Sequence, residues 1–436
     1  MINQQKNLKI FKFHAQWGIY CLISQLKRPE IKTKELIEAN QGMPVPETHR
    51  KKSVSSGKQN LLPLPWELWP SEARLLITLI IFWSIAGILV LGSASWWVAN
   101  REMGDGAYYL KRQLIWLISS WSIFFFSIST NIRNWSKLAG PCVLIGYLLV
   151  FATLIIGSTV NGASRWLIIG PLQIQPSELI KPFLILQAAN LFAHWKRIRL
   201  DQKVFWLLIF CSLLLLILKQ PNLSTAALIG ILLWLIALAG GVRFRSLVGT
   251  AFVGVLLGVS SILINEYQRM RVISFLDPWQ DPQGNGYQLV QSLLAIGSGG
   301  WFGQGFGLST QKLQYLPIQS TDFIFAVFAE EFGFLGSLML LTFLLIIAFL
   351  GLRIAIRCRN NQSKLIAIGC STLLVGQSIM NISVASGMMP TTGLPLPIIS
   401  YGGNSLISSL LISALLIRCS LESTGLIGGF ELKRSS

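Results

Sequence analysis

The sequence has little charge for its length. Only 12% of its 436 residues are Asp, Glu, Lys or Arg, whereas 52% are hydrophobic and the mean hydropathy is +0.58. A soluble domain usually carries about 25% charged residues. The shortage leaves too little polar surface to cover a water-soluble particle, which excludes a soluble enzyme, a disordered protein and a disulfide-rich secreted module. The composition therefore indicates an integral membrane protein.

Cysteine and histidine are also scarce. None of the six cysteines forms a CxxC pair or falls in an external connection as defined below, so neither a disulfide framework nor a zinc site is indicated. The three histidines are His14, His49 and His194. All three lie on or near the side that the charge distribution assigns to the cytoplasm, which excludes an external histidine-based metal or catalytic site.

The hydrophobic residues occur in long continuous runs. A helix needs roughly 20 apolar residues to cross a bilayer, and continuous rather than alternating runs argue against a β-barrel. The sequence predicts an all-α, polytopic membrane protein with about ten transmembrane helices. The predicted segments are 75–97, 110–130, 140–157, 179–195, 204–219, 222–240, 246–265, 323–350, 364–386 and 397–418.

The net charge of +18 is distributed unevenly. Ten spans place both termini on one side, and that side holds 27 of the 36 Lys and Arg residues but nine of the 18 acidic residues. The positive-inside rule then makes both termini cytoplasmic. Because this distribution accounts for the whole excess, no nucleic-acid partner is needed to explain it.

The predicted organisation has three parts. Residues 1–74 form a basic cytoplasmic tail, 75–418 a ten-helix membrane domain and 419–436 a second cytoplasmic tail. The external connections are unusual in composition, and the longest, 266–321, lies between the seventh and eighth spans. A long loop that is not of low complexity is usually functional, so we expect the chemistry on the outer face.

Three charged residues of this loop are candidates for chemistry. Asp281 precedes a proline, which disfavours helix and presents the carboxylate on a turn or an extended segment. There it would act as a general base or hold a divalent cation, or else form an ordinary Asx turn. Arg269 and Arg271 would bind a lipid phosphate, or extend toward the headgroups without a specific ligand.

Other charged residues enter apolar spans, where an unpaired charge is costly. Glu178 and Lys181 are three residues apart on one helical face, which predicts a mutual ion pair that faces a cavity, either as a structural clasp or within a substrate channel. Asp322 is placed to cap the eighth span. At least one of Glu330 and Glu331 should face protein or water, and proton relay in a transporter is an alternative role for these acids.

These residues belong to motifs that resemble a known family. The SEDS family (shape, elongation, division and sporulation), which includes FtsW, RodA and SpoVE, polymerises bacterial glycan strands. The resemblance covers roughly 75–418 in the family's order. The motifs are Asn161-Gly-Ala-Ser-Arg-Trp166, Gln175-Pro-Ser-Glu-Leu-Ile-Lys181, Asp281-Pro-Gln-Gly-Asn-Gly-Tyr-Gln288, Gln311-Lys-Leu-Gln-Tyr-Leu-Pro317, Thr321-Asp-Phe-Ile-Phe-Ala326 with Glu330-Glu331, and Pro390-Thr-Thr-Gly-Leu-Pro-Leu-Pro-Ile-Ile-Ser-Tyr-Gly-Gly403. Gly92-Ser-Ala-Ser95 and Tyr109-Leu-Lys-Arg-Gln-Leu114 look more like the division member, FtsW.

The resemblance implies a peptidoglycan glycosyltransferase of the bacterial cytoplasmic membrane that polymerises lipid II, releases undecaprenyl diphosphate and acts at the division septum. It also implies a class B penicillin-binding protein and other division proteins as partners. The family's essential loop aspartate matches Asp281, and its Glu–Lys pair matches Glu178 and Lys181. An elongation-type polymerase of the RodA kind, a lipid II flippase and a noncatalytic scaffold are the alternatives.

The implied mechanism assigns the remaining candidates. Asp281 would remove the proton of an attacking sugar hydroxyl, and Arg269, Arg271 and Lys312 would stabilise the leaving diphosphate. Glu178, Lys181 and Asp322 complete the predicted substrate-binding set. The sequence shows no closed metal site, so the metal ligands are unknown and the need for a divalent cation stays open.

Overall fold

Ten helices or helix pairs coincide with the ten apolar runs. The computed structural model describes residues 66–424 except 161–162, 171, 314–315 and 318, and they belong to one compact unit, Leu61–Ser436. The two predicted tails therefore lie mostly outside the described residues. The helices that match the runs are α2 (Ser71–Met103), α3 (Tyr108–Ser129), α4 (Ile132–Ile156), α5 (Pro176–Leu179) with α6 (Lys181–Ala193), α7 (Leu200–Lys219), α8 (Leu223–Ala239), α9 (Phe244–Ile264), α12 (Ile324–Arg357), α13 (Asn361–Ala385) and α14 (Gly403–Ser423).

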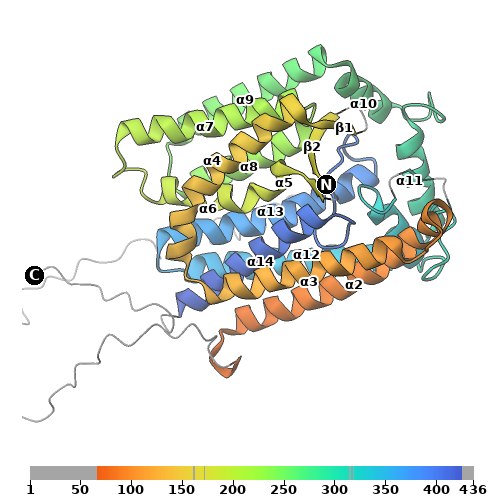
Figure 1. The fold of residues 1–436 in the computed structure, drawn as a ribbon, viewed down its shortest axis with the longest axis horizontal. Helices are drawn as coiled ribbons and strands as arrows, with labels where there is room; N and C mark the ends of the chain where they lie inside the picture. The colour runs from red at the N-terminus through yellow and green to blue at the C-terminus, as the bar shows by residue number, and fades with distance from the viewer. Residues whose placement is uncertain (1–65, 161–162, 171, 314–315, 318, 425–436) are drawn as a thin grey trace, which may run out of the picture. The chain divides into compact units, whose positions relative to one another are not determined.

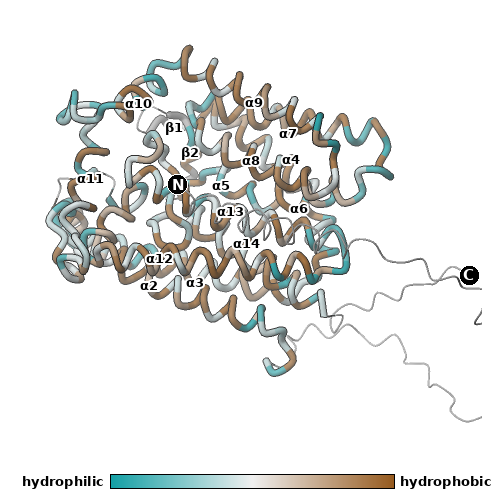
Figure 2. The backbone as a smooth tube through the Cα atoms, turned by 180° about the vertical axis from the view of Figure 1, so that it is seen from behind, coloured by the Kyte–Doolittle hydropathy of each residue, from teal (hydrophilic) through white to brown (hydrophobic). Residues whose placement is uncertain are grey.

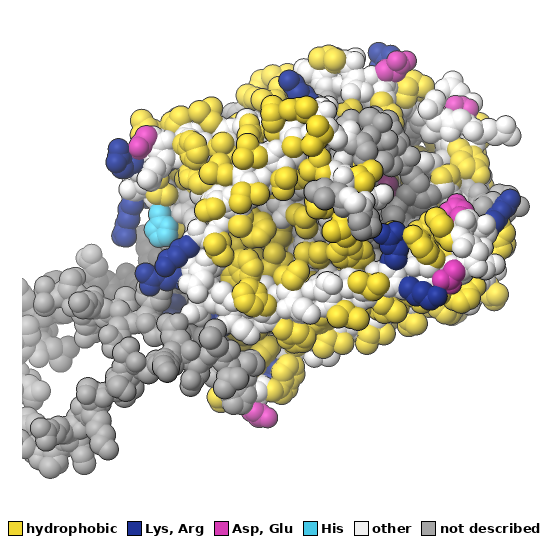
Figure 3. Space-filling model, in the orientation of Figure 1, with side chains coloured by type: hydrophobic (Ala, Val, Ile, Leu, Met, Phe, Trp, Pro, Cys, Tyr) yellow, Lys and Arg dark blue, Asp and Glu magenta, His cyan; other side chains and the backbone are white. Residues whose placement is uncertain are grey.

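The all-α membrane class is confirmed. Within the described residues, seven helices are long and apolar enough to cross a membrane: α2, α4, α7, α9, α12, α13 and α14. The apolar helix α8 is shorter, so the count of ten spans stays a prediction. Hydrophobic segments run along the length of the helices in Figure 2, and hydrophobic side chains cover the flank of the bundle in Figure 3.

The centre of the bundle is formed by α13 and α14. α13 packs against α6, α8, α12 and α14, and α14 also packs against α3. In the most apolar 18-residue stretch of α14, 89% is buried, whereas in the corresponding stretch of α9 only 6% is buried. α9 therefore lies at the periphery, where it contacts α8 and the short helix α10 (Glu266–Leu276) (Figure 1).

One end of the bundle carries most of the short elements, and we call it the outer end. It holds the antiparallel strands β1 (Ser158–Val160), β2 (Ala163–Ile169) and β3 (Leu172–Ile174), together with α10 and α11 (Tyr287–Ser298) (Figure 1). The long loop predicted at 266–321 is thus partly helical. A short 3-10 helix, η1 (Trp66–Leu68), precedes α2.

Two of the apolar runs are interrupted. The run predicted at 179–195 breaks at Ile180, between α5 and α6, in the turn that Pro182 deprives of a backbone donor. α12 breaks at Gly333, whose φ of 67° and ψ of −164° are not helical.

The segment 300–305 fills the break in α12. The N–H groups of Gln304 and Gly305 donate to the carbonyls of Glu330 and Glu331 over 2.9 and 3.1 Å. In return, the N–H groups of Phe334 and Leu335 donate to the carbonyls of Gly300 and Trp301 over 2.8 and 3.1 Å. A broken helix is tolerated at membrane depth only when its backbone groups find such partners.

Candidate functional site

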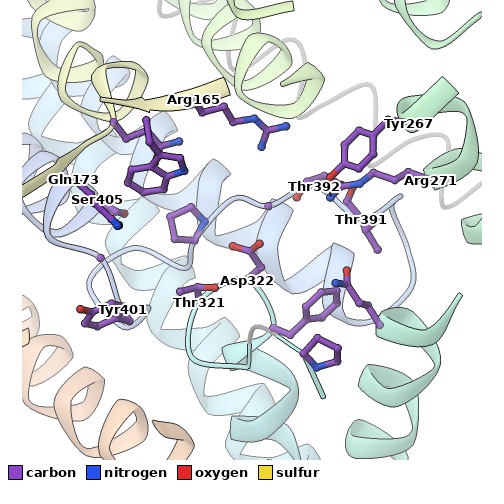
Figure 4. A pocket seen from close by; sticks show the side chains of 18 of the residues that line it. Arg165, Gln173, Tyr267, Arg271, Thr321, Asp322, Thr391, Thr392, Tyr401 and Ser405 are labelled. Carbon is purple, nitrogen blue, oxygen red and sulfur yellow. Dashed lines mark hydrogen bonds between the residues drawn. The ribbon is translucent and has the colours of Figure 1, made fainter. Parts of the chain in front are cut away.

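A cavity of about 770 Å³ opens at the outer end of the bundle (Figure 4). The cavity is lined by the outer end of α3, strands β2 and β3 with Gln175, α10 with the turn that follows it and the start of α11, Pro317, the segment 321–323, and residues of the segment 391–405. These parts are far apart in the sequence, so the cavity forms only when the bundle packs. Its lining is mainly polar and aromatic, with three arginines: Arg112, Arg165 and Arg271.

Arg271 is the one predicted phosphate-binding cation that lines the cavity. Its guanidinium carbon lies 4.4 Å from the ring centre of Tyr267, one helical turn earlier on α10, and it also donates to the Tyr267 hydroxyl. Its Nη1 donates to the carbonyl of Thr391 over 3.1 Å. These contacts fix the plane of the guanidinium while leaving further N–H donors for a ligand.

Arg165 enters the cavity from β2. Its Nε and Nη2 donate to the carbonyls of Gln220 and Pro221 over 3.3 and 2.6 Å, which ties β2 to the turn between α7 and α8. The residue lies inside a motif that the sequence analysis quoted, yet it was not among the predicted site residues. It is the only charged residue in the sequence of the connection 158–175, and that was the available signal.

Asp322 lies below these two arginines in the view of Figure 4, near the centre of the cavity. Its carboxylate forms no ion pair within 4.0 Å with any described residue. Asp322 and Arg165 nevertheless face the same glycine: a Cβ placed on Gly393 would lie 3.4 Å from Asp322 Oδ2 and 3.7 Å from Arg165 Nη1. Burial raises the pKa of Asp322 to about 6, against the opposing effect of Arg271 and Arg165. Asp322 precedes α12, and its backbone carbonyl accepts a 2.7 Å hydrogen bond from Asn381.

The floor of the cavity is an irregular segment between α13 and α14. Gly393 has a φ of 81°, and Ile398 has a φ of 67° within a tight turn closed by the Ile399 N–H and the Pro397 carbonyl at 2.8 Å. A positive φ at a β-branched residue is strained and persists only where the surroundings enforce it. Gly87 of α2 permits this, because a Cβ there would lie 2.9 Å from the Ile398 carbonyl oxygen.

Asp281 lies at the rim of the cavity. Its side chain is exposed, and its carboxylate oxygens accept hydrogen bonds from the backbone N–H groups of Gly284 and Asn285 over 3.0 and 2.8 Å. Gly284 and Asn285 line the cavity, whereas Asp281 does not. The turn therefore holds the carboxylate next to residues that line the cavity. The same connection between α9 and α12 also carries Arg271.

Glu178 and Lys181 form the predicted ion pair. Lys181 Nζ lies 2.6 Å from Glu178 Oε1, and the two side chains are 0% and 3% exposed. Lys181 also donates to Gln377 Oε1 over 2.9 Å, and Gln377 donates to the carbonyl of Pro395, which lines the cavity. The pair itself is not among the lining residues, so the structure supports the clasp rather than direct contact with substrate.

Two predicted phosphate-binding cations do not reach the cavity. Lys312 is buried, and its Nζ lies 2.9 Å from Glu331 Oε1 and 2.9 Å from Ser93 Oγ. Its charge is thus committed to an acid of α12. Arg269 is exposed on α10 and is absent from the cavity lining. Residues two apart on a helix point in different directions, so Arg269 and Arg271 diverge on α10. Because the sequence predicts a loop here, it does not separate the two arginines.

Glu330 and Glu331 are both buried, as expected for acids that avoid lipid. Glu330 accepts hydrogen bonds from the side chain of Ser309 and from the N–H and hydroxyl of Thr310, the latter two at 2.9 Å. Both acids therefore anchor the segment 309–312 to α12. No group of three or more His, Cys, Asp or Glu among the described residues is arranged to hold a metal ion.

The chain matches the family model FTSW_RODA_SPOVE, described as a cell cycle protein, over residues 73–425. A probable peptidoglycan glycosyltransferase FtsW from Synechocystis sp. is 51% identical over 356 residues, which cover 81% of this chain and 91% of that protein. A putative peptidoglycan glycosyltransferase FtsW from Mesostigma viride is 47% identical over 356 residues, covering 81% and 85%.

Solved structures share the fold. A chain of a peptidoglycan synthase complex, described as coordinating polymerization and crosslinking, superposes with a TM-score of 0.68 at 29% identity and covers 82% of this chain and 99% of that chain. The rod shape determining protein RodA of Thermus thermophilus superposes with a TM-score of 0.60 at 28% identity, covering 81% and 97%.

Proposed function

Because this chain belongs to the FTSW_RODA_SPOVE family of cell cycle proteins, we propose that it is a peptidoglycan glycosyltransferase that polymerises lipid II during septal cell-wall synthesis. The curated relatives that carry the name peptidoglycan glycosyltransferase FtsW support the activity and the division role. The site assignments below are part of the proposal.

The observation that carries the proposal is the composition of the outer cavity. Arg165 and Arg271 converge on it without an acidic partner within 4.0 Å among the described residues, and a turn-held carboxylate, Asp281, stands at its rim. Fixed cations are the groups that bind a diphosphate, and an exposed carboxylate is the group that removes a proton from an alcohol.

The reaction joins two lipid-linked sugars. The 4-hydroxyl oxygen of one GlcNAc forms a bond to the anomeric carbon of the other substrate, whose bond to the lipid diphosphate breaks. The proton passes to the Asp281 carboxylate, and the electron pair of the broken bond leaves with the diphosphate. General base catalysis of this kind contributes about 10²–10⁴-fold.

The remaining rate enhancement comes from positioning and charge. Arg271 and Arg165 would stabilise the negative charge that develops on the leaving diphosphate, in a cavity partly shielded from water. The backbone N–H groups of Gly284 and Asn285 hold the Asp281 carboxylate without neutralising it. The clasp of Glu178, Lys181 and Gln377 positions the cavity floor through Pro395.

The remaining proposals concern location and partners. Placing the cavity on the outer face of the cytoplasmic membrane, with both termini cytoplasmic, follows from the charge distribution. In Figure 3, one group of Lys and Arg side chains lies at the end opposite to α10 and α11, and others lie near α10 and α11 and along the top. The likeness to a chain of a peptidoglycan synthase complex supports a class B penicillin-binding protein as partner, together with other division proteins.

The test is polymerisation of lipid II by the purified protein in detergent, alone and with the partner. Wild-type protein should form glycan polymer, and folded Asp281→Asn should not. Detergent micelles have no two sides, so polymer formation there excludes a protein that only moves lipid II across the membrane. Normal glycan chains from Asp281→Asn would reject Asp281 as the base, and no polymer from wild type with its partner would reject the enzyme itself.

A further inference from the structure

The cavity has two ends of different chemistry. In Figure 4, Tyr267, Arg271, Thr391 and Thr392 lie at one end, which we call the Arg271 end. Gln173, Tyr401 and Ser405 lie at the other, which we call the α14 end, and Asp322 lies between the two. The Arg271 end has the cations already described.

The α14 end is formed by the start of a long helix. The N–H groups of Gly403, Asn404 and Ser405 have no hydrogen-bond partner among the described residues, and Gly403, Asn404 and Ser405 all line the cavity. The N-terminus of a helix carries a partial positive charge and presents such free N–H groups to anions. α14 has 21 residues, so its dipole is fully developed.

A buried hydroxyl at the same place also lacks a partner. Ser405 is 6% exposed, lines the cavity, and has no hydrogen-bond partner for its Oγ among the described residues. Leaving a buried polar group unpaired costs about 1–3 kcal/mol, so this hydroxyl, on a residue that lines the cavity, is available as a hydrogen-bond partner for a ligand. This observation is independent of the helix dipole.

A third arginine borders this end. A Cβ on Gly403 would lie 2.3 Å from Trp116 Cδ2, so the Trp116 ring is packed on the start of α14. Arg112 lies four residues earlier on the same face of α3 and also lines the cavity. Its only side-chain hydrogen bond to a described residue goes from Nη1 to the Tyr108 hydroxyl, at 3.0 Å, which leaves further donors free.

We propose that Arg112 and the first turn of α14, with the Ser405 hydroxyl, form a second anion site that binds the diphosphate of the acceptor substrate. The inference rests on the proposed polymerase activity, in which both substrates carry a lipid diphosphate. One cavity that joins two such substrates needs two places for diphosphate, and these two ends provide them.

The position of Asp281 decides which end binds which substrate. The donor's diphosphate is bonded to the reacting carbon, so it lies at the reaction centre. The acceptor's diphosphate is separated from the reacting hydroxyl by the whole disaccharide. Asp281 is on the α10–α11 segment that carries Arg271, which assigns the donor diphosphate to the Arg271 end and the acceptor diphosphate to the α14 end.

The experiment separates the two substrates chemically. A lipid II analogue with its 4-hydroxyl methylated acts only as donor. An analogue with a methylene group in place of the oxygen that joins sugar to diphosphate acts only as acceptor. Full-length protein in detergent, with its partner if the polymerisation assay requires it, joins them once, and KM is measured for each at saturating concentration of the other.

Arg112→Gln should raise KM for the acceptor analogue roughly 10- to 100-fold, as for a lost hydrogen bond to a charged group, with the donor KM little changed. Arg271→Gln should raise the donor KM instead. Ser405→Ala should raise the acceptor KM roughly 2- to 10-fold. Arg112→Lys should restore part of the acceptor affinity lost in Arg112→Gln, since it keeps the charge.

Ser408→Ala is the matched control. Ser408 is on the same helix, is 2% exposed and also has an unpaired Oγ, but it does not line the cavity. Its substitution should leave both KM values unchanged. Equal effects of Arg112→Gln on both substrates, no effect, or equal effects of Ser405→Ala and Ser408→Ala would overturn the second site. If wild type makes no polymer from lipid II, the polymerase proposal fails instead.

Discussion

Lys181 Nζ lies 2.6 Å from Glu178 Oε1, and both side chains are buried. The same ammonium group donates a hydrogen bond to Gln377 Oε1. The side-chain amide nitrogen of Gln377 in turn donates to the Pro395 carbonyl over 2.9 Å. A buried charge on α6 is thus connected through α13 to the floor of the cavity. A charge pair outside the cavity is therefore joined by one side chain to a segment that lines it.

Lys181→Met should destabilise the protein by about 3–5 kcal/mol, because it leaves the Glu178 carboxylate buried without its cation. The double variant Glu178→Gln/Lys181→Met removes both charges and should recover most of that loss. Thermal unfolding in detergent measures both effects. A double variant less stable than Lys181→Met would show that the pair contributes net stability.

Gly284→Ala should abolish most glycan polymerisation while the protein stays folded. An added Cβ would lie 2.2 Å from Asp281 Oδ2 and 2.6 Å from Oδ1, so the exposed carboxylate must move away. Gly297→Ala is the control, since a Cβ there meets nothing within 4 Å. Polymerisation rates compare the two, and equal rates would mean that the carboxylate position is unimportant.

Gly333→Ala should prevent stable folding or lower the unfolding temperature sharply. The position has a φ of 67°, and a Cβ there would lie 2.3 Å from the backbone nitrogen of Gly303, which cannot yield as a side chain can. Gly230→Ala in α8 provides the comparison, because its Cβ has open space. Unfolding temperatures that drop equally for both variants would contradict the importance of the break.

Asp322→Asn should stabilise the protein at pH 8 but not below pH 4. Burial raises the pKa of Asp322 from 3.8 to about 6, so the wild type is most stable when the carboxyl is protonated and loses stability as pH rises through this range. The full shift corresponds to at most about 3 kcal/mol. Unfolding temperatures of both proteins across this pH range test it, and a constant difference would contradict the raised pKa.

Much of the fold is predictable because its signals are local. Apolar runs long enough to span a bilayer coincide with helices, and the spacing of Glu178 and Lys181 places them on one face. The break at Gly333 is different, because a glycine inside a hydrophobic run looks the same whether or not another segment inserts there. Only packing against Gly303 reveals it.

The site is less predictable because its parts come from distant segments. Lys312 and Arg271 are both cations of the external loop, yet Lys312 is neutralised by Glu331 while Arg271 faces the cavity. Which cation has an acidic neighbour depends on how α12 meets the loop. Arg112 and Ser405 are unremarkable in sequence and acquire a role only because α3 packs against α14.

The exchange of four hydrogen bonds at Gly333 has a mechanical meaning. On both sides of Gly333, α12 is hydrogen-bonded through its backbone to residues 300–305. A movement of residues 300–305 would therefore displace α12. Through Glu330 and Glu331 it would also displace the segment 309–312. Contact with residues 300–305 is thus coupled to buried side chains in the interior of the bundle.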